Sequence, residues 1–171
     1  MPRREERFSV NAPPEEVWRF IRDVESLCAC IPGVERVRLV DDRTAELTVK
    51  EKLGVVPLIL DLTARIDAEE PPRRLHATLN AEHLTMEIEV ALQAAGAVTE
   101  MTGVLQVQGK GPLKPVVDRV FEKRATERAA QFAETLGKRF GAVVPEEIPK
   151  EAKGPLRLWL ERLWCWLTSS S

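Results

Sequence analysis

The chain has 171 residues, of which 44% are hydrophobic and 30% are charged, a balance typical of one globular domain with a short appendage. The formal net charge of -2 provides no excess of basic groups for phosphate backbones, so we expect no nucleic-acid partner. Because neither a signal-peptide pattern nor a run of 18 apolar residues occurs, and three cysteines form no disulfide framework, we expect a reduced, cytoplasmic protein.

The N-terminal part of the sequence predicts one strand and two helices. The strand covers residues 6–10, and Asn11 to Pro14 end it and supply the proline near a first helical turn. Val17, Phe20 and Ile21 then recur at helical spacing. A shorter helix over residues 26–31 stops at Pro32 and Gly33, which we interpret as a turn, with the rim of a binding site as the alternative.

Residues 34–108 alternate apolar and polar side chains with a period of two. This period is typical of strands with one buried and one wet face. Turn signals, among them Asp41-Asp42, Leu53-Gly54 and Pro71-Pro72, divide the stretch into six strands.

After residues 109–112 the apolar period returns to about 3.6, which predicts a long helix with one apolar stripe. Phe121, Phe132 and Phe140 belong to this stripe. Arg124 and Arg128 lie beside it, and we expect their guanidinium groups to reach water, with contact to a ligand oxygen as the alternative.

This order of elements predicts an α+β domain over residues 1–142, in which a curved antiparallel sheet of about seven strands grips the long helix. A curved sheet and a straight helix leave space between them, so we expect a hydrophobic cavity. Trp18 is the one cavity residue expected from a helix near the N-terminus, and plain core is its alternative. The predicted lining residues are Trp18, Leu47, Val49, Leu60, Leu62, Leu79, Ile88, Val90, Met101, Leu105, Phe121 and Phe132.

Several short segments resemble the carbon monoxide dehydrogenase G-subunit family, a member of the START-like (SRPBCC) helix-grip superfamily. They are Phe8, Asn11-Ala12-Pro13, Val17-Trp18, Asp23-Val24 and the hexapeptide Cys30-Ile31-Pro32-Gly33-Val34-Glu35. The resemblance covers residues 5–141. It implies an accessory protein of molybdenum hydroxylases that takes part in membrane attachment and in the passage of reducing equivalents to quinones. A bound quinone or lipid is the ligand that fits this role, and no covalently held cofactor is required.

The C-terminal part reads as a linker followed by a short amphipathic helix. Residues 143–155 contain three prolines and many charges, which predicts an extended linker. A helix over residues 156–167 would rise only about 18 Å, too little to span a bilayer core of about 30 Å, so we expect it to lie on the inner face of the cell membrane. Packing on its own domain or in a groove of another protein is the alternative. Its membrane-docking face is Leu156, Trp159, Leu160, Leu163, Trp164, Trp166 and Leu167.

The sequence contains no pattern that predicts catalysis or a metal site. We interpret Cys28 and Cys30 as structural thiols rather than a redox pair or metal ligands, and His76 and His83 as surface residues. Two main hypotheses follow. The first is a non-enzymatic carrier of a quinone or lipid that supports a molybdenum hydroxylase, and the second is a membrane anchor for that enzyme with an incidental cavity. A cyclase-type enzyme is a third, by superfamily analogy alone.

Overall fold

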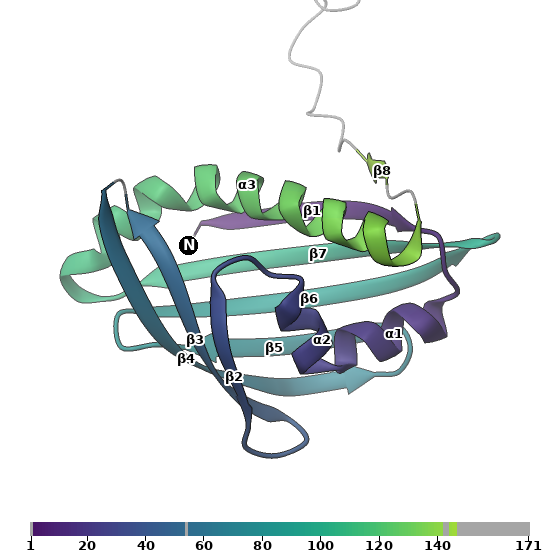
Figure 1. Ribbon diagram of the computed structural model, residues 1–171, viewed down its shortest axis with the longest axis horizontal. Helices are drawn as coiled ribbons and strands as arrows, with labels where there is room; N and C mark the ends of the chain where they lie inside the picture. The colour runs from purple at the N-terminus through teal and green to yellow at the C-terminus, as the bar shows by residue number, and fades with distance from the viewer. Residues whose placement is uncertain (1, 54, 142–143, 147–171) are drawn as a thin grey trace, which may run out of the picture.

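The computed structural model describes residues 2–53, 55–141 and 144–146 and has the predicted α+β architecture. One antiparallel sheet, in the order β2-β3-β4-β5-β6-β7-β1-β8, curves around the long helix α3 (Figure 1). Its strands are β1 (Arg3–Val10), β2 (Val34–Leu39), β3 (Thr44–Leu53), β4 (Val56–Glu70), β5 (Arg74–Asn80), β6 (Leu84–Ala95), β7 (Val98–Gly109) and β8 (Val144–Glu146). The helices are α1 (Pro14–Arg22), α2 (Val24–Ala29), the 3-10 turn η1 (Gly111–Leu113) and α3 (Lys114–Phe140).

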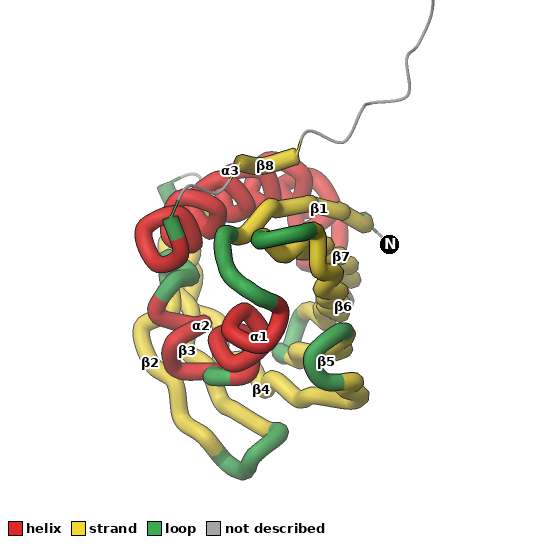
Figure 2. Tube along the Cα trace, turned by 90° about the vertical axis from the view of Figure 1, so that its right-hand side faces the viewer, coloured by secondary structure: helices red, strands yellow, loops and turns green. Residues whose placement is uncertain are grey.

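The apolar and polar side chains that alternate along each strand lie on opposite faces of the sheet. On β4, Leu62 and Ile66 are buried while Asp61 and Arg65 are exposed. The pairing shifts register between Ile66 and Ala68, and a second shift occurs on β2. Bulges of this kind increase strand twist, so the sheet bends into the deep curve seen end-on in Figure 2.

Helices α1 and α2 lie inside one end of this curve (Figure 2). Asp23 ends α1 and caps α2, because its carboxylate accepts hydrogen bonds from the Ser26 backbone at 3.2 Å and from the Ser26 hydroxyl at 2.6 Å. These hydrogen bonds lower the pKa of Asp23 below that of a free aspartate. The cap also explains why the second helix begins two residues before the predicted residue 26.

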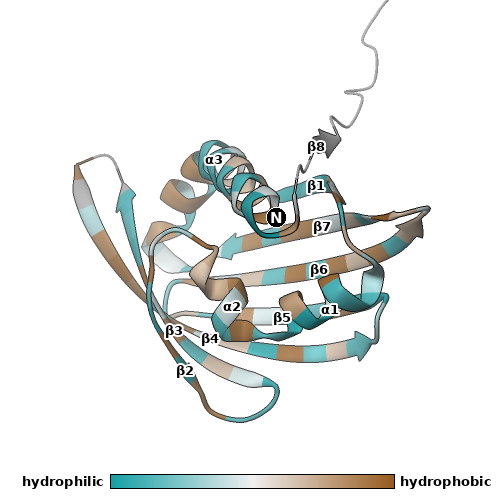
Figure 3. Ribbon diagram, turned by 45° about the vertical axis from the view of Figure 1, so that its right-hand side comes forward, coloured by the Kyte–Doolittle hydropathy of each residue, from teal (hydrophilic) through white to brown (hydrophobic). Residues whose placement is uncertain are grey.

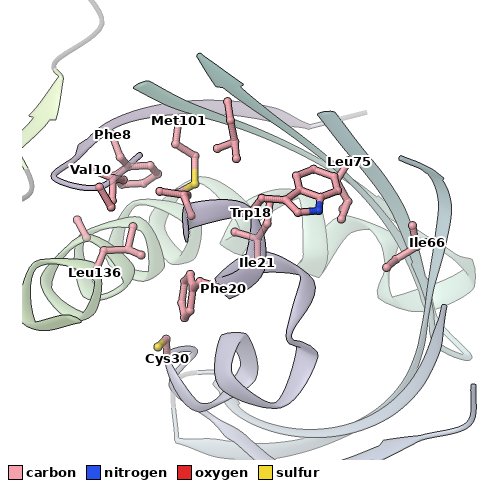
Figure 4. Packing of buried hydrophobic residues seen from close by; sticks show 14 residues of the cluster. Phe8, Val10, Trp18, Phe20, Ile21, Cys30, Ile66, Leu75, Met101 and Leu136 are labelled. Carbon is pink, nitrogen blue, oxygen red and sulfur yellow. The ribbon is translucent and has the colours of Figure 1, made fainter. Parts of the chain in front are cut away.

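The interior of the domain is divided into three clusters of buried apolar side chains. One lies where α1 meets β1 and the end of α3, a second lies between α2 and strands β3 to β6, and a third joins β7 to the first half of α3. Figure 4 shows the first cluster, in which Trp18 points toward Leu75. Phe8 and Phe132 meet edge-to-face there, with ring centroids 5.8 Å apart. Met86 packs against both the second and the third cluster and so connects them.

Two predicted boundaries differ from the structure. The first strand begins at Arg3 rather than at Glu6, because β7 offers pairing partners along the whole of β1. Residues 144–146, at the start of the predicted linker, pair with β1 as β8. Residues 147–155 and the predicted helix 156–167 lie outside the described residues. Within the described part, no helix combines the length and the apolar character needed to cross a bilayer.

Candidate functional site

All twelve residues predicted to line the interior belong to the three apolar clusters or pack against them. Six are buried: Trp18, Leu47, Leu62, Leu79, Met101 and Phe121. Six keep part of their surface accessible: Val49, Leu60, Ile88, Val90, Leu105 and Phe132. We call this second group the interior belt.

The interior belt lies on the inner face of the sheet and on the facing side of α3. Ile88 and Leu105 are direct cross-strand neighbours on β6 and β7, and Val49 and Leu60 are neighbours on β3 and β4. Each packs against a cluster on one side, yet none is fully covered by protein. An apolar molecule that covered these side chains would gain about 25 cal/mol for each Å² removed from water.

Two hollows of about 280 Å³ each lie elsewhere on the molecule. One is lined by Arg73, Arg74 and neighbours on β6 and β7, and the other by Phe20, Arg139 and neighbours on α1 and α3. Neither is lined by a residue of the interior belt. Their charged linings do not suit a quinone or a lipid chain, and the predicted apolar cavity stays a prediction.

A polar group stands at one end of the interior belt. Arg128 of α3 donates hydrogen bonds to the carboxylate of Glu51 on β3 and to the backbone oxygen of Pro32. Arg124, one turn earlier, donates to the backbone oxygen of Lys52. The prediction that the guanidinium group reaches into water is therefore wrong for Arg128, whereas the Arg124 side chain keeps 35% of its surface exposed. The curl of the sheet brings backbone oxygens within reach of α3, and these replace water as partners.

Gly33 makes the close approach of these segments feasible. Its φ of +90° lies in the region that favours glycine, and its oxygen accepts a hydrogen bond from the Lys50 backbone at 2.7 Å. A Cβ at this position would lie 2.6 Å from the Lys50 oxygen and 3.1 Å from the Arg128 guanidinium. The interpretation of Pro32 and Gly33 as a turn is confirmed, and their role as the rim of a binding site stays a prediction.

A second polar pair, Arg4 and Glu6, was missed by the sequence analysis. These residues alternate with Phe8 and Val10 on the inner face of β1, and Arg4 Nε lies 2.5 Å from the Glu6 carboxylate. The pair faces the same side of the sheet as Leu105, which is the direct partner of Arg4. A strand predicted to begin at Glu6 could not reveal it.

The titratable groups named in the sequence analysis show no arrangement for catalysis. Cys28 and Cys30 are buried, and burial raises the pKa of the Cys28 thiol to about 11. His76 lies on the outer face, with Nδ1 3.3 Å from Asp67. Among the residues that the structure describes, no group of three or more metal-binding side chains comes together.

Comparisons with known proteins agree on family and fold. A family model described as the G subunit of carbon monoxide dehydrogenase (CoxG) matches residues 7–141. A search of curated proteins finds no match.

Solved structures share the fold at low sequence identity. A conserved protein from Geobacillus kaustophilus is 18% identical with a TM-score of 0.69, over 80% of this chain and 95% of the other. A START superfamily protein from Mycobacterium smegmatis is 18% identical with a TM-score of 0.65, over 81% and 96%. The Zhui aromatase/cyclase from Streptomyces sp. R1128 is 14% identical with a TM-score of 0.59, over 81% and 95%. At these identities the likeness establishes the START-like helix-grip fold alone.

Proposed function

The chain belongs to the CoxG family of carbon monoxide dehydrogenase subunits, and we propose that it is a non-enzymatic carrier of a quinone or another lipidic molecule. The carrier works at the inner face of the cell membrane and supports a molybdenum hydroxylase such as carbon monoxide dehydrogenase. Quinones and lipids partition into membranes, so a carrier for them needs both an apolar binding surface and a way to reach the bilayer.

The interior belt is the observation that carries this proposal. Its six apolar residues come from β3, β4, β6, β7 and α3, and they face inward while part of their surface stays uncovered. These side chains therefore offer apolar area to a ligand on the inner side of the sheet. A chain-like or ring-like apolar ligand between the sheet and α3 would complete the burial.

Arg128 gives the ligand an orientation in this proposal. Its guanidinium stands at the β3 end of the belt, held by Glu51 and Pro32. A guanidinium has five N–H donors, and only some of them are used by these two partners. A carbonyl oxygen on the head of the ligand would accept from the others, while the apolar remainder of the ligand lies along the belt.

The chemistry of the inner face favours binding over catalysis, although one structural neighbour is an aromatase/cyclase. Both histidines lie on the outside of the described domain, and the raised pKa of Cys28 keeps its thiol protonated at neutral pH. On the inner face, Glu51 is ion-paired with Arg128 and Glu6 with Arg4, and the buried Thr99 hydroxyl donates to the Ala12 oxygen. None of them is paired with a nucleophile.

Mass spectrometry of organic extracts from natively purified full-length protein tests the proposal. Val90→Gln places an amide in the interior belt, and Val104→Gln is its matched control on the outer face of the neighbouring strand, where Val104 pairs with Glu89. We expect a stoichiometric quinone or lipid from the wild type and from Val104→Gln. The Val90→Gln variant should retain at most about a fifth of it, because an unpaired buried amide costs about 1 to 3 kcal/mol.

A third variant separates the carrier from the anchor. Replacing Trp159, Trp164 and Trp166 by serine removes the apolar rings of the predicted membrane-docking segment. Ligand retained in this variant supports a binding site inside the domain. Ligand lost with the tryptophans and unaffected by Val90→Gln would mean that lipid adheres to the C-terminal segment, and absence of ligand in every form would favour the anchor.

A further inference from the structure

The turn between β3 and β4 carries apolar side chains that nothing in the described domain covers. Val55 is 98% exposed and Ile59 is 62% exposed, and Pro57 between them is exposed as well. Figure 3 shows the start of β4 in brown beside the teal end of β3, where this hairpin projects from the molecule. Large apolar groups at a projecting turn lower solubility unless they have a partner.

Basic residues accompany these apolar side chains. Lys52 pairs with Pro57 and Lys50 pairs with Ile59, so each lysine stands beside an exposed apolar residue on the outer face of the hairpin. Arg36 lies on β2 opposite Thr48 of β3, and it adds a third basic side chain to this face. Glu35, whose Oε1 lies 3.8 Å from Lys50 Nζ, and Asp61, opposite Thr48, offset two of these three positive charges, so Lys52 at the tip keeps its charge unpaired by either. We call Lys50, Lys52, Val55, Pro57 and Ile59 the hairpin surface.

The opposite end of β3 has similar apolar exposure and the opposite charge. Leu39 and Val40 are each 53% exposed at the β2–β3 turn, where Asp41 and Asp42 follow them. Arg43, next in the chain, shares the Glu69 carboxylate with Arg22, and its Nη2 lies 3.3 Å from Glu69 Oε1. The ten residues of β3 place the two turns about 30 Å apart. A flat surface that the hairpin meets end-on, at one turn, therefore does not meet the other turn.

We propose that the hairpin surface is a second membrane-docking site, which inserts Val55 into the interface of an anionic bilayer while Lys50 and Lys52 contact lipid phosphates. Apolar side chains beside lysines fit a bilayer because its interface is apolar below and negatively charged above. The acidic β2–β3 turn is repelled by the same surface. Charge thus selects which end of the molecule faces the membrane.

The inference rests on the proposed function and deepens it. The hairpin that carries this surface also carries Val49 and Leu60 of the interior belt on its other face. Arg124 and Arg128 tie its backbone and Glu51 to α3, so the hairpin surface has a defined position relative to the belt. Docking there brings the polar end of the belt next to the bilayer from which a lipidic ligand comes.

Site-specific fluorescence on the full-length chain tests this docking. In a Cys165→Ser background, Val55→Cys and Val40→Cys are each labelled with an environment-sensitive NBD dye, and Cys28 and Cys30 stay unlabelled because they are buried. The vesicles contain about three parts phosphatidylcholine to one part phosphatidylglycerol, or phosphatidylcholine alone. We expect a blue shift for the dye at position 55 on the anionic vesicles, and no change for the dye at position 40.

A charge variant adds an independent measurement. Lys52→Gln should weaken binding to the anionic vesicles about fivefold in flotation, because a lysine near an anionic surface contributes about that factor. Arg65→Gln removes the same charge opposite Thr44, at the other end of β3, and should leave binding unchanged.

Three results would overturn the inference. If the chain floats with vesicles while the dye at position 55 stays in water, the membrane contact belongs to the C-terminal segment alone. The carrier proposal is then tested separately, by the ligand that is extracted from the protein. If that dye shifts with protein concentration in the absence of vesicles, a second copy of the chain covers the hairpin surface. If no form floats and the dye is unchanged, the membrane part of the proposed function fails as well.

Discussion

Arg128 and Glu51 form an ion pair between the middle of α3 and the far end of β3, across 77 residues of sequence. Both side chains are partly buried, and Arg128 also binds the backbone oxygen of Pro32. One guanidinium therefore connects the long helix, the β3–β4 hairpin and the turn before β2. The position of the hairpin relative to α3 depends on that connection.

Removing this guanidinium should destabilise the protein. Arg128→Met keeps most of the side-chain volume but leaves the Glu51 carboxylate without its partner, so we expect the free energy of unfolding to fall by about 1 to 3 kcal/mol. Urea unfolding measures the change. In a double-mutant cycle with Glu51→Gln, the two substitutions should couple by about 1 kcal/mol, and purely additive effects would contradict the connection.

Gly33→Ala should be more damaging than Gly96→Ala. Both glycines have positive φ, at 90° and 65°, so both substitutions carry a backbone penalty of about 1 kcal/mol. Only at Gly33 would the new Cβ also meet protein atoms, with the Lys50 oxygen at 2.6 Å, whereas nothing lies within 4 Å at Gly96. Thermal or urea unfolding should show at least about 1 kcal/mol of further loss for Gly33→Ala. Equal losses would mean that the turn relaxes freely.

Thr99 offers a test of how α1 is held at the end of the sheet. Its side chain is completely buried, and its hydroxyl donates to the Ala12 oxygen at 2.7 Å. Thr99→Val keeps the shape and removes the donor, which should cost about 1 to 2 kcal/mol in the free energy of unfolding. Thr102→Val, at a half-exposed position of the same strand, should change it by less than about 0.5 kcal/mol. A neutral Thr99→Val would show that water replaces the hydroxyl.

The buried thiol of Cys28 predicts a loss of stability at alkaline pH. Burial raises its pKa from 9.0 to about 11 in the folded chain, so the unfolded chain loses this proton first as the pH rises. The contribution of the Cys28 thiol to the free energy of unfolding is complete below pH 9, falls as the pH rises toward 11 and then levels off. Urea midpoints measured from about pH 8 to about pH 11 should fall more steeply for the wild type than for Cys28→Ala. Parallel curves would place the thiol in contact with water.

Local patterns in the sequence determined the architecture. The period-two alternation of β4 and the 3.6-residue stripe of α3 each reflect burial of one face, and burial has the same periodicity wherever the element finally packs. The predicted inward residues, from Leu47 to Phe132, accordingly lie in the interior. The resemblance carried by residues such as Cys30 to Glu35 agrees with the family model, which matches residues 7–141.

Only the tertiary structure decided which distant groups meet. Arg128 was expected in water because a long basic side chain beside an apolar stripe usually extends its charged end there, whereas Glu51 and Pro32 reach it only once the sheet has curled. Arg4 and Glu6 became an inner-face pair because β7 extends the pairing of β1. Which inward side chains are fully buried, and which keep part of their surface accessible as the interior belt does, depends on sheet curvature. Curvature is the sum of small twists and bulges over many strands, so it cannot be predicted from the periodicity of any one strand.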